Sequence, residues 1–319
     1  MGALLELRDL VVTYHSRGRA SLTAVAGVSI DLQEAHTLAL IGESGSGKST
    51  IARAICGLIR AESGAITIDG RDLLKEAEQP EAAGRYGIQI VFQDPVSSLD
   101  PRWPIWRSVA EPRLARFPGS TDTHRRAAVA LLERVGLPAS FADRKPHQLS
   151  GGQRQRVTIA RALAAAPRLI ILDEAVSALD VSVRNEILAL LDELKRERQL
   201  TYLFISHDMG AVAQVASDVA VLYLGRLVEM GSADAVIRRP MHPYTRALIA
   251  AVPSLTRIGT REARAIGEID DPAAPPPGCR FHRRCAYAAD ICRRDVPVER
   301  EYAGRVLACH RAEDIALMM

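Results

Sequence analysis

The segment GESGSGKST, residues 42–50, constrains this chain more than any other part of its sequence. It matches the phosphate-loop pattern of glycine, four residues, glycine, lysine, and serine or threonine. The apolar run HTLALIG precedes it and predicts a buried strand, and the periodic run STIARAICGLI follows it and predicts a helix. Backbone N–H groups and the start of a helix would then face an anion. The segment therefore predicts a nucleotide-phosphate site in an α/β fold.

Each part of this segment has an expected role. Three glycines allow the backbone to turn its N–H groups toward phosphates, Lys48 is expected to reach the β- and γ-phosphates, and Ser49 is expected to bind Mg²⁺ through its hydroxyl. The predicted nucleotide contacts are Gly42, Glu43, Ser44, Gly45, Ser46, Gly47, Lys48, Ser49 and Thr50.

A second chemical motif ends the apolar run LIILDEA, residues 169–175. A buried strand there would present Asp173 to the Mg²⁺ shell and Glu174 to the water that attacks the γ-phosphate. Two adjacent carboxylates can divide the metal and base roles in this way. Together with the phosphate loop, the pair predicts nucleotide hydrolysis.

The remaining patterns predict the arrangement around these motifs. Alternating runs at residues 4–14 and 25–32 favour antiparallel strands, while residues 169–175 and 201–208 favour strands buried on both faces of a parallel sheet. Residues 94–167 are mainly helical in pattern. A further helix is expected to follow Ser182, its predicted N-cap.

Composition narrows the classes of protein that fit. A net charge of +3 over 319 residues gives no strong nucleic-acid footprint, and no apolar run approaches the length of a membrane-spanning helix. The first residues lack the pattern of a signal peptide, so we expect a protein of the reducing cytosol. Thiols in that compartment favour metal binding over disulfides.

Four of the five cysteines lie in the last fifth of the chain, behind a proline-rich run: Cys279, Cys285, Cys292 and Cys309. Their spacing matches neither the close pairs of structural zinc sites nor that of ferredoxins, so either Zn²⁺ or a 4Fe–4S cluster remains open. Unliganded buried thiols are the third alternative. His310 is a possible substitute ligand, although a surface histidine is the simpler interpretation, and Cys56 is expected to be a core residue.

The octapeptide LSGGQRQR, residues 149–156, resembles the signature of the ATP-binding cassette proteins. The resemblance covers roughly residues 5–232 and implies a mixed sheet with an antiparallel β subdomain and a helical subdomain. It also implies a head-to-tail dimer in which the signature of one domain closes on ATP held by the other. The implied contacts are Tyr14 on adenine, Gln93 on Mg²⁺, Ser150, Gly151, Gly152, Gln153 and Asp180 on the partner's nucleotide, and Glu174, His207, Gln93 and Lys48 in catalysis.

Three further segments narrow the resemblance. QDPVSSLDPR, ALDVSVRNEILALL and MHPYTRALIAAVP, with the cysteine-containing tail, are similar to the ATPase subunits of bacterial oligopeptide, dipeptide and nickel importers. The stretches SSLDPR and AVSALDVSV look more like the F-type subunit than its D-type partner. The resemblance implies ATP-driven pairing with a second ATPase subunit, two membrane permease subunits and an external binding protein. It places the chain at the cytoplasmic face of the membrane and favours 4Fe–4S over zinc.

The expected organisation is a nucleotide-binding domain over residues 1–235, with its helical subdomain at about 94–167. A C-terminal extension over residues 236–319 would contain a linker at about 258–277 and the cysteine cluster at 279–309. We expect peptide import, with import of nickel or another small solute as the alternative.

Two other classes of cassette protein fit the sequence less well. A soluble cassette ATPase of DNA repair would carry a long coiled coil or zinc modules before the signature, and a cassette translation factor would carry two nucleotide domains. Neither feature occurs in this sequence. Arginines around the cysteines leave a nucleic-acid-binding metal module as a third candidate, which salt-dependent binding to nucleic acid would support.

Overall fold

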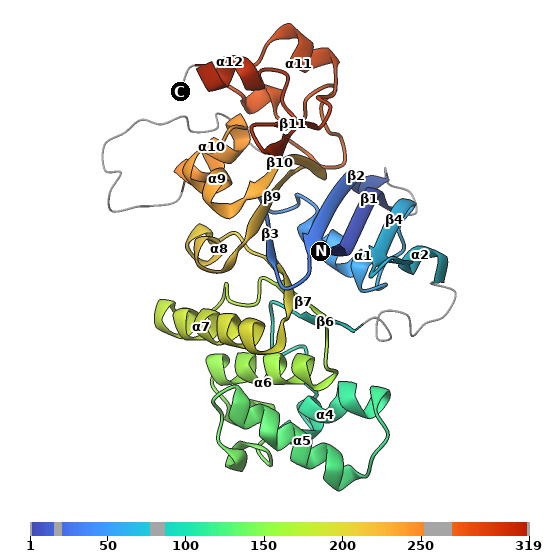
Figure 1. Cartoon of the computed structure of the whole chain (residues 1–319), viewed down its shortest axis with the longest axis vertical. Helices are drawn as coiled ribbons and strands as arrows, with labels where there is room; N and C mark the ends of the chain where they lie inside the picture. Colours follow the sequence, from blue (N-terminus) through green and yellow to red (C-terminus); the bar gives the residue numbers. More distant parts are fainter. Residues whose placement is uncertain (1, 16–20, 77–86, 252–269, 318–319) are drawn as a thin grey trace.

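The computed structural model of the chain describes residues 2–15, 21–76, 87–251 and 270–317. Within these residues two sheets form the centre of the molecule, a helical lobe lies at one end and the C-terminal extension lies at the other (Figure 1). The arrangement is the α/β fold with a mixed sheet, an antiparallel β subdomain and a helical subdomain that the sequence predicted.

The larger sheet has eight strands among the described residues, in the order β11-β12-β10-β9-β3-β8-β7-β6. Strands β6, β7, β8, β3 and β9 are parallel, and β10, β12 and β11 continue the sheet in antiparallel fashion. All residues of β3, β7 and β8 are buried, which explains why their sequences are continuous apolar runs. The strands are β3 (Thr37–Ile41), β6 (Ile88–Val91), β7 (Leu169–Asp173), β8 (Thr201–Ile205), β9 (Asp218–Tyr223), β10 (Arg226–Ser232), β11 (Arg300–Tyr302) and β12 (Arg305–Leu307).

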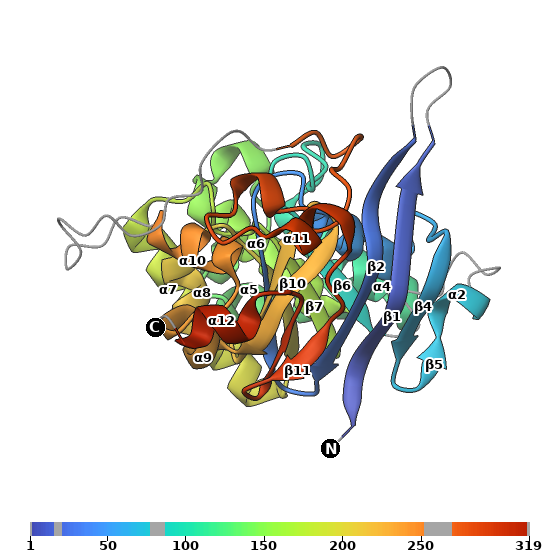
Figure 2. The same cartoon turned by 90° about the horizontal axis from the view of Figure 1, so that it is seen from above.

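The smaller sheet is antiparallel, with the order β2-β1-β4-β5, and its long strands run side by side in Figure 2. Its strands are β1 (Ala3–Tyr14), β2 (Leu22–Gln33), β4 (Ser63–Ile68) and β5 (Arg71–Asp72). Buried and more exposed positions alternate over much of β2, as expected for a sheet with one face on the core. The predicted antiparallel pair is therefore confirmed.

Helices surround the larger sheet, and none among the described residues is long and apolar enough to span a bilayer. The helical lobe contains α4, α5 and α6, within the region predicted to be helical (Figure 1). The helices are α1 (Lys48–Ile55), α2 (Leu73–Glu76), α4 (Ile105–Arg116), α5 (Thr121–Arg134), α6 (Gly151–Ala164), α7 (Val181–Arg198), α8 (Met209–Val215), α9 (Ala233–Arg238), α10 (Pro243–Ala250), α11 (Asp290–Arg294) and α12 (Ala312–Leu317).

The predicted N-cap of α7 was wrong. The helix begins at Val181, and the carboxylate of Asp180, not the hydroxyl of Ser182, accepts the N–H of Val183 at 3.0 Å. Ser182 instead donates its hydroxyl to the same carboxylate. Aspartate and serine are similarly good N-caps, so the pattern alone did not distinguish two candidates that lie two residues apart.

The C-terminal extension continues the larger sheet. Strand β12 pairs with β10 through Glu229–Leu307 and Met230–Val306, and β11 pairs with β12. Phe281 of the extension also belongs to the main hydrophobic core. Of the linker predicted at about 258–277, the part up to residue 269 lies outside the described residues.

A buried ion pair joins the extension to β10. The side chain of Glu229 is fully buried and accepts a hydrogen bond from Arg305 of β12 at 2.9 Å. The same carboxylate accepts the backbone N–H groups of Met241 and His242, just before α10. Arg305 also donates to the backbone carbonyl of Arg239. Glu229 and Arg305 therefore tie β10, β12, α9 and α10 together.

Candidate functional site

The phosphate loop follows β3 and leads into α1, as its sequence predicted. Gly42 and Gly47 have φ angles of 151° and 101°. A Cβ atom on Gly42 would lie 2.2 Å from the carbonyl oxygen of Leu222, and one on Gly47 would lie 2.4 Å from that of Ala24. The close packing of the loop against its neighbours, as much as its φ angles, therefore requires glycine at both positions.

Lys48 is held inside the loop. Its ammonium group donates to the carbonyl oxygens of Gly42 and Glu43, both at 2.9 Å, and to the hydroxyl of Ser46 at 3.2 Å. Burial lowers the pKa of Lys48, while the nearby carboxylates of Glu174, Asp173 and Glu43 oppose that shift. The loop backbone thus holds a cation at the start of α1, where a polyphosphate could replace the carbonyl contacts.

Two oxygen donors meet beside this lysine. The hydroxyl of Ser49 donates to the carboxylate of Asp173, at the end of β7, over 2.9 Å. Burial raises the pKa of Asp173, and the hydrogen bond from Ser49 and the charge of Lys48 act in the opposite direction. A hydroxyl and a carboxylate at this edge of the sheet are the hard ligands that Mg²⁺ prefers, so this donor set fits the metal.

Glu174 and His207 face each other at the ends of neighbouring parallel strands. Glu174 has a φ angle of 51°, and its N–H donates to the carbonyl of Ile205, the last residue of β8. The Glu174 carboxylate lies 3.6 Å from Nδ1 of His207. A non-glycine residue with positive φ is sparsely populated, which marks this turn as one held by its surroundings.

Tyr14 and Gln93 are two further residues that the sequence predicted to contact the nucleotide or Mg²⁺. The hydroxyl of Tyr14, at the end of β1, lies 3.3 Å from that of Thr50 in α1, which brings the expected adenine-stacking residue beside the loop. Gln93 is exposed in the segment that follows β6.

The predicted signature residues lie elsewhere on the molecule, in the helical lobe. Ser150 caps α6, and Ser150 and Gln153 exchange hydrogen bonds in a capping box. In Figure 1, α6 and α1 lie on opposite sides of β6 and β7. The start of α6, with exposed Ser150 and Gly151, is a second helix N-terminus open to an anion. Within one chain, the start of α6 and the phosphate loop therefore lie apart.

The four clustered cysteines line one small cavity in the extension: Cys279, Cys285, Cys292 and Cys309, with His282, His310 and Arg311. Burial raises the pKa of Cys279 to about 12 and that of Cys309 to about 11, and the other thiols of the cluster add to both shifts. Among the described residues, however, no group of three or more His, Cys, Asp or Glu side chains is arranged closely enough to hold a metal ion. Cys56, by contrast, packs beside the core, and burial raises its pKa to about 12.

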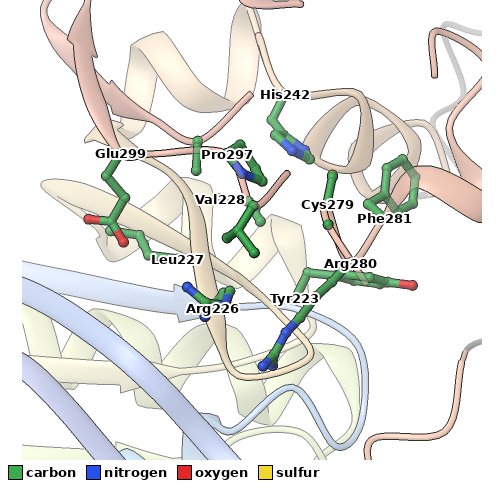
Figure 3. Close-up of a pocket in the computed structure, with 13 residues that line it drawn as sticks. Tyr223, Arg226, Leu227, Val228, His242, Cys279, Arg280, Phe281, Pro297 and Glu299 are labelled. Carbon is green, nitrogen blue, oxygen red and sulfur yellow. The ribbon is translucent and has the colours of Figure 1, made fainter. Parts of the chain in front are cut away.

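A second cavity, of about 30 Å³, lies between β10 and the extension (Figure 3). Figure 3 shows Val228 on one side of it and Cys279 and Phe281 on the other, with Tyr223 beneath these two residues. The extension is thus packed directly on the strand that follows β9, close to the phosphate loop.

Two residues that the sequence did not assign to the nucleotide site contact that loop. The hydroxyl of Tyr244 accepts the backbone N–H of Glu43 at 2.8 Å, and Arg284 pairs with the carboxylate of Glu43 at 2.7 and 2.9 Å. The Glu43 side chain, predicted among the nucleotide contacts, is therefore engaged by Arg284. Both residues lie in segments that the sequence marked only as family features, and no spacing rule links either one to the phosphate loop.

Comparison with known proteins gives two family matches. Residues 25–177 match the model of the ABC transporter family, and residues 228–292 match that of the oligopeptide/dipeptide transporter C-terminal region. The first match contains the phosphate loop, and the second contains Tyr244 and Arg284.

Individual relatives agree with these models. The chain is 41% identical to the di/tripeptide transport ATP-binding protein DppF of Pseudomonas aeruginosa, over 98% of this chain and 99% of that protein. It is 43% identical to the oligopeptide transport ATP-binding protein OppF of Escherichia coli, over 92% of each. Its structure resembles the ATP-binding cassette MJ0796 in a dimeric post-hydrolysis state with ADP and phosphate, with a TM-score of 0.65, 30% identity, and coverage of 72% of this chain and 98% of that one.

Proposed function

This chain belongs to the ABC transporter ATPases, in the group that carries the oligopeptide/dipeptide transporter C-terminal region, and from that membership we propose that it powers the import of peptides. As a member of this family it binds and hydrolyses ATP. The observation that carries the proposal is the combination, in one chain, of a complete phosphate loop and an extension of the peptide-transporter type. Import of nickel or another small solute is not favoured, because the relatives DppF and OppF are named for di-, tri- and oligopeptides.

We propose the following division of roles in ATP hydrolysis. Lys48 binds the β- and γ-phosphates, and the ring of Tyr14 stacks on adenine. Ser49, Asp173 and Gln93 hold Mg²⁺, whose chemistry when bound is to neutralise charge on the phosphate oxygens. The 2.9 Å contact between Ser49 and Asp173 supports the first two of these three ligands.

The position of Glu174 suits it to accept the proton of the attacking water. Water attacks the γ-phosphorus, the bond from phosphorus to the bridging oxygen of ADP breaks, and Glu174 accepts the proton of the water. His207, within 3.6 Å of that carboxylate, orients it and contacts the γ-phosphate. Support for these roles comes from the meeting of Glu174 and His207 at adjacent strand ends.

We propose that the second half of the site comes from another ATPase subunit. Ser150, Gly151, Gly152 and Gln153 would contact the γ-phosphate held by the partner, and Asp180 would lie at the same interface. The exposed start of α6 supports this assignment, since it leaves an anion-binding helix terminus free for a partner. The relatives named DppF and OppF support an F-type subunit that pairs with a D-type one.

The remaining partners are two permease subunits in the membrane and, through them, an external peptide-binding protein. The chain would then work at the cytoplasmic face of the membrane. The described helices contain no membrane-spanning candidate, so contact with the bilayer would be made through the permeases.

A peptide-uptake experiment tests this function. Deleting the gene from an amino-acid auxotroph of the source bacterium is expected to abolish growth on a dipeptide that supplies that amino acid. The wild-type gene should restore growth and uptake of labelled peptide, whereas a Lys48→Ala variant should not. Loss of labelled nickel uptake with intact peptide uptake would contradict the proposal, and so would a protein that does not co-purify with membrane subunits.

We further propose that the cysteine cluster holds a metal centre, with a 4Fe–4S cluster favoured over Zn²⁺. The convergence of four thiols on one cavity supports it, and rearrangement of their side chains on binding is required. Bound metal would keep its thiol ligands deprotonated, although burial raises the pKa values of Cys279, Cys285 and Cys309, and it would cross-link the segments of the extension. Nothing in ATP hydrolysis calls for an electron, so the role is structural.

Metal analysis of anaerobically purified protein tests the centre. Iron and sulfide in equal amounts, with a brown colour, are expected for the wild type; stoichiometric zinc in colourless protein would select the alternative metal. Cys292→Ser should lose most of the metal, whereas Cys56→Ser, which alters a partly buried thiol outside the cluster, should keep it. Metal-free wild-type protein would contradict the proposal.

A further inference from the structure

Glu43, the second residue of the phosphate loop, is fixed at each of its polar groups. Its carbonyl oxygen accepts the ammonium group of Lys48 at 2.9 Å. Its backbone N–H donates to the hydroxyl of Tyr244 at 2.8 Å, and its carboxylate accepts two hydrogen bonds from Arg284. Two of these three anchors belong to the region matched by the peptide-transporter C-terminal model.

The tyrosine anchor is rigid because it is packed among aromatic rings. Tyr244 is 1% exposed, and its ring centroid lies 4.6 Å from that of Tyr223 and 5.4 Å from that of Phe281. Phe281 in turn lies edge-on to Tyr223 at 5.3 Å. A buried ring with such neighbours has little freedom to move its hydroxyl away from the loop.

The arginine anchor is also nearly buried. The side chain of Arg284 is 7% exposed, and it pairs with the Glu43 carboxylate in a two-pronged contact. Its guanidinium lies 5.7 Å from the centroids of the Tyr223 and Phe281 rings, and it donates to the Tyr223 hydroxyl at 3.3 Å. The planar guanidinium fork matches a carboxylate in one geometry, so this contact fixes direction as well as distance.

Charge gives the pair a consequence for nucleotide binding. The Glu43 carboxylate belongs to the same short loop that would surround a triphosphate, which carries several negative charges. Arg284 offsets that carboxylate at 2.7 Å, and removing the guanidinium would leave an unpaired, three-quarters-buried anion in the loop. The unpaired Glu43 carboxylate would then repel the phosphates, and Glu43 would no longer be held in its position in the loop.

We propose that Arg284 of the C-terminal extension is a positioning residue of the nucleotide site, which acts through Glu43 and so makes ATP affinity depend on the extension. The inference rests on ATP binding at the phosphate loop. It adds a residue of the C-terminal region to a site otherwise assembled from the ABC domain, 241 positions away along the chain. Arg284 directly precedes Cys285 of the cysteine cluster. A movement of Cys285 would therefore also move Arg284 and, through its side chain, Glu43.

A mutant cycle on the full chain tests the proposal, with fluorescent ATP binding and melting temperature measured for every variant. Arg284→Met is expected to weaken ATP binding on the order of tenfold, and Arg284→Lys, which keeps the charge but loses the fork, by a smaller factor. Adding Glu43→Gln to Arg284→Met removes the unpaired anion and should recover most of the affinity. The matched control is Arg238→Met, which breaks an exposed pair with Asp234 within α9 and should leave affinity unchanged.

Three outcomes would overturn the inference. Arg284→Met could bind ATP as tightly as Arg238→Met, it could lower only the melting temperature, or the losses of the two single variants could simply add in the double variant. Should Arg284→Met fail to fold, Arg284→Lys and Glu43→Gln carry the same comparison. The Lys48→Ala variant is the reference that should bind no ATP. If the wild-type protein also bound no ATP, that result would contradict the proposed function itself.

Discussion

Replacing Glu174 with glutamine is expected to lower ATP turnover by about 10²–10⁴-fold while ATP remains bound, because the amide keeps the shape of the side chain but cannot accept a proton. The backbone of this residue is held at a φ angle of 51° by the bond from its N–H to Ile205, so the substitution should leave the turn intact. Asp173, which contacts Ser49, and Lys48 are untouched, and nucleotide affinity should persist.

The measurement is phosphate release by the assembled transporter at saturating Mg²⁺–ATP, together with light scattering to detect an ATP-bound ATPase dimer. The variant should accumulate that dimer, because ATP joins the two subunits and hydrolysis would release them. Glu193→Gln is a matched control, since Glu193 lies exposed on α7 and pairs with Arg134 at the end of α5. Turnover at the wild-type rate in the Glu174→Gln transporter would remove Glu174 from its proposed role.

Arg305→Met is expected to destabilise the chain by about 3–5 kcal/mol, with a fall of roughly 5–15 °C in melting temperature. The substitution leaves the Glu229 carboxylate, which is fully buried, without its counter-ion. Two backbone N–H groups, from Met241 and His242, would still contact that carboxylate, but they carry no full charge. The attachment of the extension to β10 should therefore weaken first.

Thermal unfolding and limited proteolysis would measure this effect. Arg300 of the neighbouring strand β11 forms an exposed pair with Glu313 of α12, and Arg300→Met should change the melting temperature little. The double variant Glu229→Gln/Arg305→Met removes both buried charges and should regain much of the lost stability. If Arg305→Met had the same melting temperature as the wild type, the pair would not hold the extension in place.

Much of the fold and of the nucleotide site was predictable because the relevant information is local. The phosphate loop carries its strand, glycines, lysine and helix in one continuous segment, and the all-buried strands β3, β7 and β8 appear as apolar runs. Neighbouring parallel strands end at the same edge of their sheet. Asp173 and Glu174 at the end of β7, and His207 after β8, could therefore be expected near the loop, although the role of His207 came from the family resemblance.

Local patterns were insufficient where equivalent groups compete or where the chain returns from far away. Asp180 and Ser182 are both residue types that cap helices well, and the structure shows Asp180 as the N-cap of α7. The cysteine spacing named no metal, because ligand geometry depends on the folded positions of thiols that are up to 30 residues apart along the chain.

By itself, then, the sequence determined an ATP-hydrolysing cassette and the peptide-importer group, because those conclusions rest on contiguous motifs whose chemistry is visible residue by residue. Only the tertiary structure decided that Tyr244 and Arg284 hold Glu43. Phe281, three residues before Arg284, packs against Tyr223 and Tyr244 and so brings this part of the extension beside the loop. No local periodicity encodes a contact between segments so far apart in the chain.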